Sequence, residues 1–290
     1  MASRPFLRAM FVGAGVALAA VAGVAVYRHS TVDPAPQALP PDFDPGNFAR
    51  GRQKLDAPYV VTDYDVVDAM LSLAEVRPNE YVIDLGTGDG RIPIAAAKSS
   101  GARGLGVDID PARVREAQQN ARAAGVAHRV EFRRQNLFDT PLADADVVTL
   151  YLTPEVNARL RPRILEQMRA GTRVVSHDFD MGDWTADRRV RIGSASVYLW
   201  IVPARVGGRW TLTVDGRPAE LQLDQLYQQV RGSVRSGGRI SRVEQGVVSG
   251  PRIRFIASVG GTRRVFEGRA DGDTIVPTDA GAGWRAVRAD

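Results

Sequence analysis

The feature that constrains the fold most is a short apolar run, residues 81–85, which overlaps the octapeptide Asp-Leu-Gly-Thr-Gly-Asp-Gly-Arg at residues 84–91. The apolar run predicts a buried strand. The three glycines allow the backbone to turn tightly and a ligand to approach the main chain. A helical pattern follows at residues 92–98, with Pro93 in the first turn, where the missing N–H group costs nothing. A strand, a glycine-rich turn and a helix in this order predict a nucleotide-type site in an α/β fold.

The alternation of strand and helix continues through the middle of the chain. After a helix at 64–73 and the strand at 81–85, further strands are expected at 104–109, 130–134, 147–152, 172–176, 190–192 and 197–202, with helices at 111–124 and 155–168. Because parallel strands need crossover helices, this order predicts a doubly wound α/β domain with a mostly parallel, seven-stranded, Rossmann-like sheet over residues 56–203. Short alternating stretches separated by glycine-containing turns then predict a small antiparallel β domain over residues 204–290.

The N-terminus carries a different signal. An apolar run at residues 9–27 follows Arg4 and Arg8, and the segment at 31–55 is polar and rich in proline near its start. We interpret residues 1–30 as a transmembrane anchor or a signal segment, with an uncleaved anchor favoured by the length of the run, and residues 31–55 as a linker. The two arginines favour a cytoplasmic N-terminus, which would send the rest of the chain across the membrane, whereas Arg50, Arg52 and Lys54 after the run weaken that assignment and leave the side open.

Composition excludes several kinds of site. The chain contains no cysteine and only three histidines, His29, His128 and His177, which lie far apart. Disulfide bonds, thiolate metal sites and cysteine nucleophiles are therefore excluded, and no spacing indicates a metal site. The net charge of +5 comes from arginines spread along the chain rather than from a dense basic block, so nucleic acid is not the favoured partner.

Two acidic residues narrow the ligand class. A dinucleotide fingerprint needs a third glycine where Arg91 stands, which argues against a pyrophosphate ligand. Asp84, near the end of the first strand, suits a ligand with a cationic amino-acid part. Asp108, near the end of the second strand, lies where an acid meets ribose hydroxyls in this architecture. With Gly86 and Gly88 leaving room for the ligand body, these residues predict S-adenosylmethionine (SAM) as the cofactor.

Polar residues after the next strands extend this site. Asn136 and Leu137 follow the third strand, where they are predicted to hold the edge and face of adenine, although a turn role for Asn136 is an equal alternative. Asp110, directly before Pro111, is interpreted as the N-cap of the following helix.

The motifs together resemble class I SAM-dependent methyltransferases over residues 81–202. A narrower resemblance, to the FAM173-type lysine methyltransferases related to Dot1-like enzymes and to their bacterial relatives, is carried by residues 58–62 (Pro-Tyr-Val-Val-Thr), 84–91, 150–157 (Leu-Tyr-Leu-Thr-Pro-Glu-Val-Asn) and 175–184 (Val-Ser-His-Asp-Phe-Asp-Met-Gly-Asp-Trp). This resemblance implies methyl transfer to a lysine ε-amine of a protein, with a membrane protein as one candidate acceptor. It also places Tyr59 and Thr87 among the cofactor-binding residues.

Three residues are candidates for the acceptor side. Tyr151 and Asn157 are predicted to line an acceptor pocket beyond the fourth strand, the alternatives being a core position for Tyr151 and a helix-surface position for Asn157. His177 is predicted either to assist deprotonation or to bond within the loop after the fifth strand. The Asn/Asp-Pro-Pro-Tyr/Phe clamp of amino-methylating DNA enzymes is absent after the fourth strand.

Two other functions remain compatible with the sequence. A membrane tether would bring the enzyme equally close to a lipid or small-molecule acceptor. An exported chain would retain the fold as a non-catalytic binding module. Because SAM is made in the cytosol, the enzyme interpretation favours attachment to the cytoplasmic face of a membrane.

Overall fold

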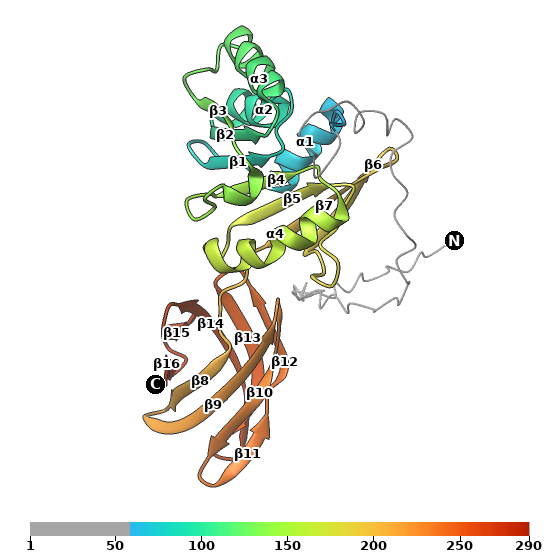
Figure 1. Ribbon diagram of the computed structural model, residues 1–290. Helices are drawn as coiled ribbons and strands as arrows, with labels where there is room; N and C mark the ends of the chain where they lie inside the picture. The colour runs from blue at the N-terminus through green and yellow to red at the C-terminus, as the bar shows by residue number, and fades with distance from the viewer. Residues whose placement is uncertain (1–58, 290) are drawn as a thin grey trace, which may run out of the picture. The chain divides into compact units, whose positions relative to one another are not determined.

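The computed structural model of the protein describes residues 59–289. Two sheets organise these residues, and Figure 1 shows them as separate groups of strands. The predicted membrane or signal segment at residues 1–30 and the linker at residues 31–55 lie outside the described residues. Among residues 59–289, no helix combines the length and the apolar character that a bilayer crossing requires.

The first sheet has seven strands in the order β3-β2-β1-β4-β5-β7-β6. Its strands are β1 (Tyr81–Leu85), β2 (Arg103–Asp108), β3 (Val130–Arg134), β4 (Val147–Leu150), β5 (Arg173–His177), β6 (Arg188–Ile192) and β7 (Ala195–Ile201). Strands β1 to β5 are parallel, whereas β7 runs antiparallel to β5 and to β6. The predicted mostly parallel, Rossmann-like sheet is therefore confirmed. The direction of winding reverses between β1 and β4, which is where ligands bind in sheets of this type.

Within residues 59–289, four α-helices pack on this sheet, namely α1 (Tyr64–Leu73), α2 (Arg91–Ser100), α3 (Pro111–Ala123) and α4 (Pro154–Gln167). Helix α1 precedes β1, whereas α2, α3 and α4 each begin beside the carboxyl end of the strand before them. The Asp110 carboxylate accepts a hydrogen bond from the Ala112 N–H at 2.7 Å, which confirms the predicted cap of α3. The hydroxyl of Thr153 caps α4 in the same way, at 3.4 Å from the Val156 nitrogen. Both α3 and α4 place proline at their first position, where a missing N–H is tolerated.

Helices cover both faces of the first sheet (Figure 1). Side chains alternate along each strand, so neighbouring residues such as Val82 and Ile83 belong to different hydrophobic clusters. One cluster contains Ile83 and the α4 residue Leu160, and the other contains Val82 and the α1 residue Met70. Burial on both faces explains why β1 and β4 are mostly apolar rather than alternating, with Asp84 and Thr149 as their buried polar residues.

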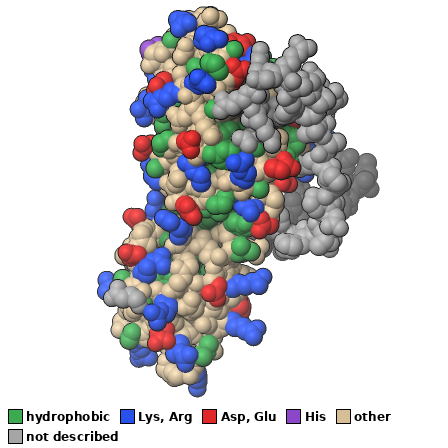
Figure 2. Space-filling model, in the orientation of Figure 1, with side chains coloured by type: hydrophobic (Ala, Val, Ile, Leu, Met, Phe, Trp, Pro, Cys, Tyr) green, Lys and Arg blue, Asp and Glu red, His purple; other side chains and the backbone are tan. Residues whose placement is uncertain are grey.

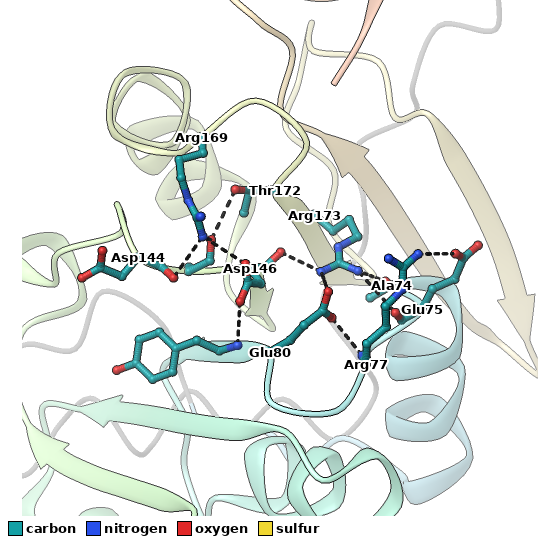
Figure 3. A network of polar contacts seen from close by, with 11 residues as sticks. Ala74, Glu75, Arg77, Glu80, Asp144, Asp146, Arg169, Thr172 and Arg173 are labelled. Atoms are coloured by element: carbon teal, nitrogen blue, oxygen red, sulfur yellow. Dashed lines mark hydrogen bonds and ion pairs between the residues drawn. The ribbon is translucent and has the colours of Figure 1, made fainter. Parts of the chain in front are cut away.

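A network of ion pairs and hydrogen bonds fastens the amino ends of the central strands (Figure 3). The Arg173 guanidinium lies 2.9 Å from the Glu80 carboxylate and also donates to the carbonyl oxygen of Ala74 at 3.1 Å. The Asp146 carboxylate accepts from the Tyr81 N–H at 2.9 Å and pairs with Arg169 at 3.0 Å. These contacts tie the starts of β1, β4 and β5 together, at the opposite end of the strands from the glycine-rich loop.

The second sheet is antiparallel throughout and closes on itself. Its strands are β8 (Gly208–Val214), β9 (Arg217–Leu226), β10 (Gln229–Ser236), β11 (Arg239–Arg242), β12 (Glu244–Ser249), β13 (Arg252–Val259), β14 (Thr262–Asp271), β15 (Thr274–Pro277) and β16 (Trp284–Arg288). It closes because β9 pairs with both β8 and β10, and β16 pairs with β8. Its core includes Trp210, Trp284 and the stacked rings of Phe255 and Phe266, whose centroids lie 4.8 Å apart. The expectation of an antiparallel β arrangement after Pro203 is confirmed.

Candidate functional site

A cavity of about 600 Å³ lies at the carboxyl ends of β1, β2, β3 and β4. Its lining includes every predicted cofactor residue, namely Tyr59, Asp84, Gly86, Thr87, Gly88, Asp108, Asn136 and Leu137. It also includes Tyr151 from the predicted acceptor side. The first sheet therefore brings together residues that are up to 92 positions apart in the sequence, at the point where its winding reverses.

The glycine-rich loop after β1 forms one wall of this cavity. Gly86 and Gly88 have φ angles of 81° and 54°, in the left-handed region where side chains other than glycine are strained. A Cβ atom added to Gly88 would lie 2.3 Å from the ring of Tyr59, so the loop and this ring are in direct contact only because residue 88 is glycine. The Arg113 guanidinium lies over the Tyr59 ring at 4.0 Å from its centroid, which holds the ring in place from a second direction.

Arg91 fastens residues 59–62 to this loop. Its Nη2 atom lies 2.6 Å from the Asp89 carboxylate, and its Nη1 atom donates to the Thr62 carbonyl oxygen at 2.6 Å. The guanidinium charge is therefore neutralised within the protein and is not free to anchor a pyrophosphate. Thr62 was not among the predicted site residues, and Arg91 was noted in the sequence only for replacing a glycine.

Asp84 is almost completely buried at the edge of the cavity, with 2% of its surface exposed. The hydroxyl of Thr149 donates to its carboxylate at 2.6 Å. Burial raises the pKa of Asp84 to about 6, and the hydrogen bond from Thr149 opposes this increase. A carboxylate in such surroundings is stabilised by a nearby cation, which the amino-acid part of SAM provides.

Asp108 is oriented by two backbone donors. Its carboxylate accepts from the Gly88 N–H at 3.0 Å and from the Asp110 N–H at 2.9 Å. Burial raises the pKa of Asp108, while these two hydrogen bonds act in the opposite direction. The carboxyl group thus lies beside the glycine-rich loop with a fixed orientation, in the arrangement predicted for binding ribose hydroxyls.

Asn136 and Leu137 lie at the third strand end. Asn136 accepts a hydrogen bond from the Phe138 N–H at 2.9 Å and caps the short helix η2 (Leu137–Asp139). Both residues also line the cavity. The turn role proposed as an alternative for Asn136 is therefore present in the structure, and it holds the residue at the cavity wall.

The three predicted acceptor-side residues lie near one another but are not equivalent. The ring of Tyr151 lines the cavity and stacks on the ring of His177, with centroids 3.8 Å apart. His177 lies behind it and does not line the cavity. The prediction that Asn157 lines an acceptor pocket needs correction, because this residue is 0% exposed and donates to the carbonyl oxygens of Phe179 and Asp180 at 3.1 and 3.2 Å. Asn157 faces the sheet from the first turn of α4 and braces the loop after β5.

The residues present fit SAM better than a dinucleotide. The cavity is of a size that a nucleoside ligand fills, and it combines two oriented carboxylates with an arginine that is already neutralised. Within residues 59–289, no group of three or more histidine, aspartate or glutamate side chains is arranged to hold a metal ion.

Comparison with known proteins gives a consistent result. A protein-family model described as the ANTKMT methyltransferase domain matches residues 84–188, which lie within the first sheet and its helices. A protein-lysine N-methyltransferase of Saccharolobus islandicus (strain REY15A) is 38% identical over 150 residues, covering 50% of this chain and 93% of that protein. The adenine nucleotide translocase lysine N-methyltransferase of Mus musculus is 33% identical over 160 residues, covering 55% of this chain and 69% of that protein.

A solved structure shares the same fold. The RNA methyltransferase from Salinibacter ruber, in complex with S-adenosyl-L-homocysteine, is 52% identical and has a TM-score of 0.50, covering 51% of this chain and 96% of that one. The bound product of SAM in that structure agrees with the cofactor inferred from the cavity. The chain therefore belongs to the family of SAM-dependent methyltransferases described by the ANTKMT methyltransferase domain.

Proposed function

We propose that this protein transfers methyl groups from SAM to the ε-amine of a lysine side chain in a protein. The observation that carries the proposal is the 38% identity to a protein-lysine N-methyltransferase whose length this chain covers to 93%. The cavity supports it, because the residues predicted to bind the cofactor and the aromatic residue predicted to face the acceptor line one space.

The chemistry asks little of the protein beyond alignment and the exclusion of water. When bound, SAM supplies a methyl group on a positively charged sulfur. Asp84 and Asp108 would hold the amino-acid and ribose parts of the cofactor, and residues 59–62 would cover it. Tyr151 would form the wall beside which the neutral amine is aligned. Direct displacement needs no covalent intermediate with the protein, which agrees with a chain that contains no cysteine.

RNA is a second candidate acceptor, because the Salinibacter ruber protein that is 52% identical is described as an RNA methyltransferase. The charge balance of residues 59–203 argues against an RNA acceptor. Residues 59–203 contain 18 Lys and Arg against 20 Asp and Glu, so this part of the chain carries no excess of positive charge for a phosphate backbone. On the face seen in Figure 2, basic and acidic side chains are interspersed.

The acceptor is tested by labelling. The full-length protein is incubated with methyl-labelled SAM and with soluble and membrane fractions of its source cells, and the fractions are then treated separately with protease, with ribonuclease and by lipid extraction. Label that is released by protease and recovered as methyl-lysine after acid hydrolysis supports the proposal. Label that is lost only with ribonuclease or only with lipid extraction contradicts it. The Asp84→Ala and Asp108→Ala variants are the controls for dependence on the cofactor site.

We also propose that residues 9–27 attach the enzyme to the cytoplasmic face of a membrane. The apolar character of this run supports attachment to a membrane. The cytosolic origin of SAM supports the cytoplasmic side, as do Arg50, Arg52 and Lys54 after the run, whereas Arg4 and Arg8 before it favour the opposite orientation. A reporter fused after Asp290 is expected to be active in the cytoplasm and to sediment with membranes. Activity only outside the cytoplasm would instead favour the exported, non-catalytic binding module.

A further inference from the structure

His177, the last residue of β5, has a defined contact on each side of its ring. Its Nδ1 atom lies 3.2 Å from the Thr62 hydroxyl, and its Nε2 atom lies 3.4 Å from the Asp178 carboxylate. One face of the ring stacks on Tyr151 at 3.8 Å between centroids, with 29° between the two planes. Only 5% of the residue is exposed.

These contacts favour one protonation state of the ring. The Asp178 carboxylate beside Nε2 carries only acceptor oxygens, so it favours the tautomer in which Nε2 carries the proton. Nδ1 is then the acceptor, and the Thr62 hydroxyl donates to it. Burial lowers the pKa of His177, whereas the nearby carboxylates of Asp178 and Asp63 act in the opposite direction, and the ring is therefore neutral at pH 7. Both ring nitrogens are occupied, which leaves no lone pair to remove a proton from an acceptor amine.

The same contacts join the two sides of the cavity. The Thr62 carbonyl oxygen accepts from Arg91, so this residue is held by the glycine-rich loop on one side and by His177 on the other. Thr62 and Tyr151 both line the cavity, and His177 touches both of them from behind. The covering segment at residues 59–62 and the acceptor-side ring are thus connected through one imidazole.

We propose that His177 is a positioning residue that sets the ring of Tyr151 relative to residues 59–62, and that it takes no proton from the acceptor. Only the kinetic test of this inference depends on the proposed methyl transfer. The bonding pattern of the ring is tested independently of any acceptor.

Substitutions at both ends of the Thr62–His177 hydrogen bond distinguish a positioning role of His177 from a role in proton removal. Thr62→Val removes the hydroxyl and keeps the carbonyl that Arg91 binds, and His177→Asn places an amide oxygen near the position of Nδ1. Thr172→Val is the matched control. Thr172 directly precedes β5, and its buried hydroxyl donates to the Ala145 carbonyl oxygen, so the variant also removes a buried hydroxyl but away from the cavity. The affinity of each variant for S-adenosylhomocysteine, measured by calorimetry, shows whether the cofactor site remains folded.

For a positioning role, Thr62→Val and His177→Asn each lower kcat about fivefold, as expected for one hydrogen bond, and change the S-adenosylhomocysteine affinity by less than about twofold. The acidic limb of the pH profile of kcat/KM persists in both, and Thr172→Val resembles the wild type. Loss of about 100-fold or more in kcat for His177→Asn, together with loss of the acidic limb, indicates a general base and overturns the inference. Wild-type kinetics in both variants also overturn it.

Nitrogen NMR of the histidine rings in the full-length protein gives the second test. The expected spectrum at pH 7.5 shows His177 as the neutral Nε2–H tautomer, and the Nδ1 resonance shifts in Thr62→Val but not in Thr172→Val. A neutral Nδ1–H tautomer or a doubly protonated ring refutes the inference. If no protein acceptor is ever labelled, the proposed function fails, while this measurement still decides the role of His177.

Discussion

Replacement of Asp84 by asparagine is expected to stabilise the protein and weaken cofactor binding at the same time. Burial raises the pKa of Asp84 from 3.8 to about 6. Each pKa unit corresponds to about 1.4 kcal/mol, so ionisation of this carboxyl costs the folded state about 3 kcal/mol relative to the unfolded chain. Because the folded pKa is the higher one, the stabilising effect of the protonated group is complete below pH 3.8 and is lost as the pH rises through 6.

Asparagine at this position never ionises, and its amide oxygen can still accept from the Thr149 hydroxyl. The amide nitrogen needs partners of its own, which offsets about 1 kcal/mol of the gain. Asp84→Asn should therefore raise the free energy of unfolding by about 2 kcal/mol at pH 8, whereas at pH 4, where Asp84 is protonated in the folded state, the cost of the amide remains and the substitution should lower it by up to about 1 kcal/mol. Urea denaturation at the two pH values measures this difference.

The same substitution removes the charge that faces the cationic part of the cofactor. A hydrogen bond to a charged group contributes about 1.5–3 kcal/mol, so the affinity for S-adenosylhomocysteine at pH 8 should fall by about 10- to 100-fold. Asp187→Asn is the control, because Asp187 is another partly buried carboxyl with a raised pKa but does not line the cavity. Two results would refute this explanation. One is an unchanged affinity of Asp84→Asn for S-adenosylhomocysteine, and the other is a gain in the free energy of unfolding over the wild type that is no larger at pH 8 than at pH 4.

Three further substitutions test other parts of the structure. Asp108→Asn should weaken S-adenosylhomocysteine binding about tenfold in calorimetry, since it removes the charge but not the size of the group; full affinity would contradict the ribose assignment. Gly88→Ala should reduce binding at least about tenfold because the new methyl group meets the Tyr59 ring at 2.3 Å, and a smaller residue at position 59 should partly restore it. Arg173→Ala should lower the free energy of unfolding by about 3 kcal/mol without changing cofactor affinity, whereas the exposed Arg77→Ala should change neither, as urea denaturation and calorimetry will show.

The strands of the first sheet could be predicted because burial on both faces leaves a direct trace in the sequence. The strands that pair on both sides contain apolar residues on consecutive or alternate positions, and their predicted positions were correct to within one or two residues. The differences lie where polar residues continue a strand. β5 extends to His177 because this residue pairs with Val197, and β6 begins at Arg188 because an exposed edge strand needs no apolar residues.

Within the site, residues whose role follows from their place near a strand end were easier to predict than residues whose role depends on contacts with distant parts of the chain. Asp84 and Asp108 followed from their places near the ends of β1 and β2. The role of Thr62 did not, because its partners Arg91 and His177 lie 29 and 115 positions away and no local pattern encodes such distances. Asn157 offered a usable signal, since it shares the spacing of the buried Leu160 and should have been placed on the inner face of α4.

The energetic cost of the buried Asp84 carboxylate favours a cationic cofactor. A buried carboxylate with a raised pKa weakens the fold at neutral pH, and asparagine would occupy the same space without that cost. A ligand that carries a positive charge makes aspartate more favourable than asparagine at this position, because it stabilises the ionised form of Asp84 at the edge of the cavity. A pyrophosphate would do the opposite and would also find Arg91 already neutralised by Asp89. The charge at position 84 therefore makes physical sense with a cationic nucleoside such as SAM and not with a dinucleotide.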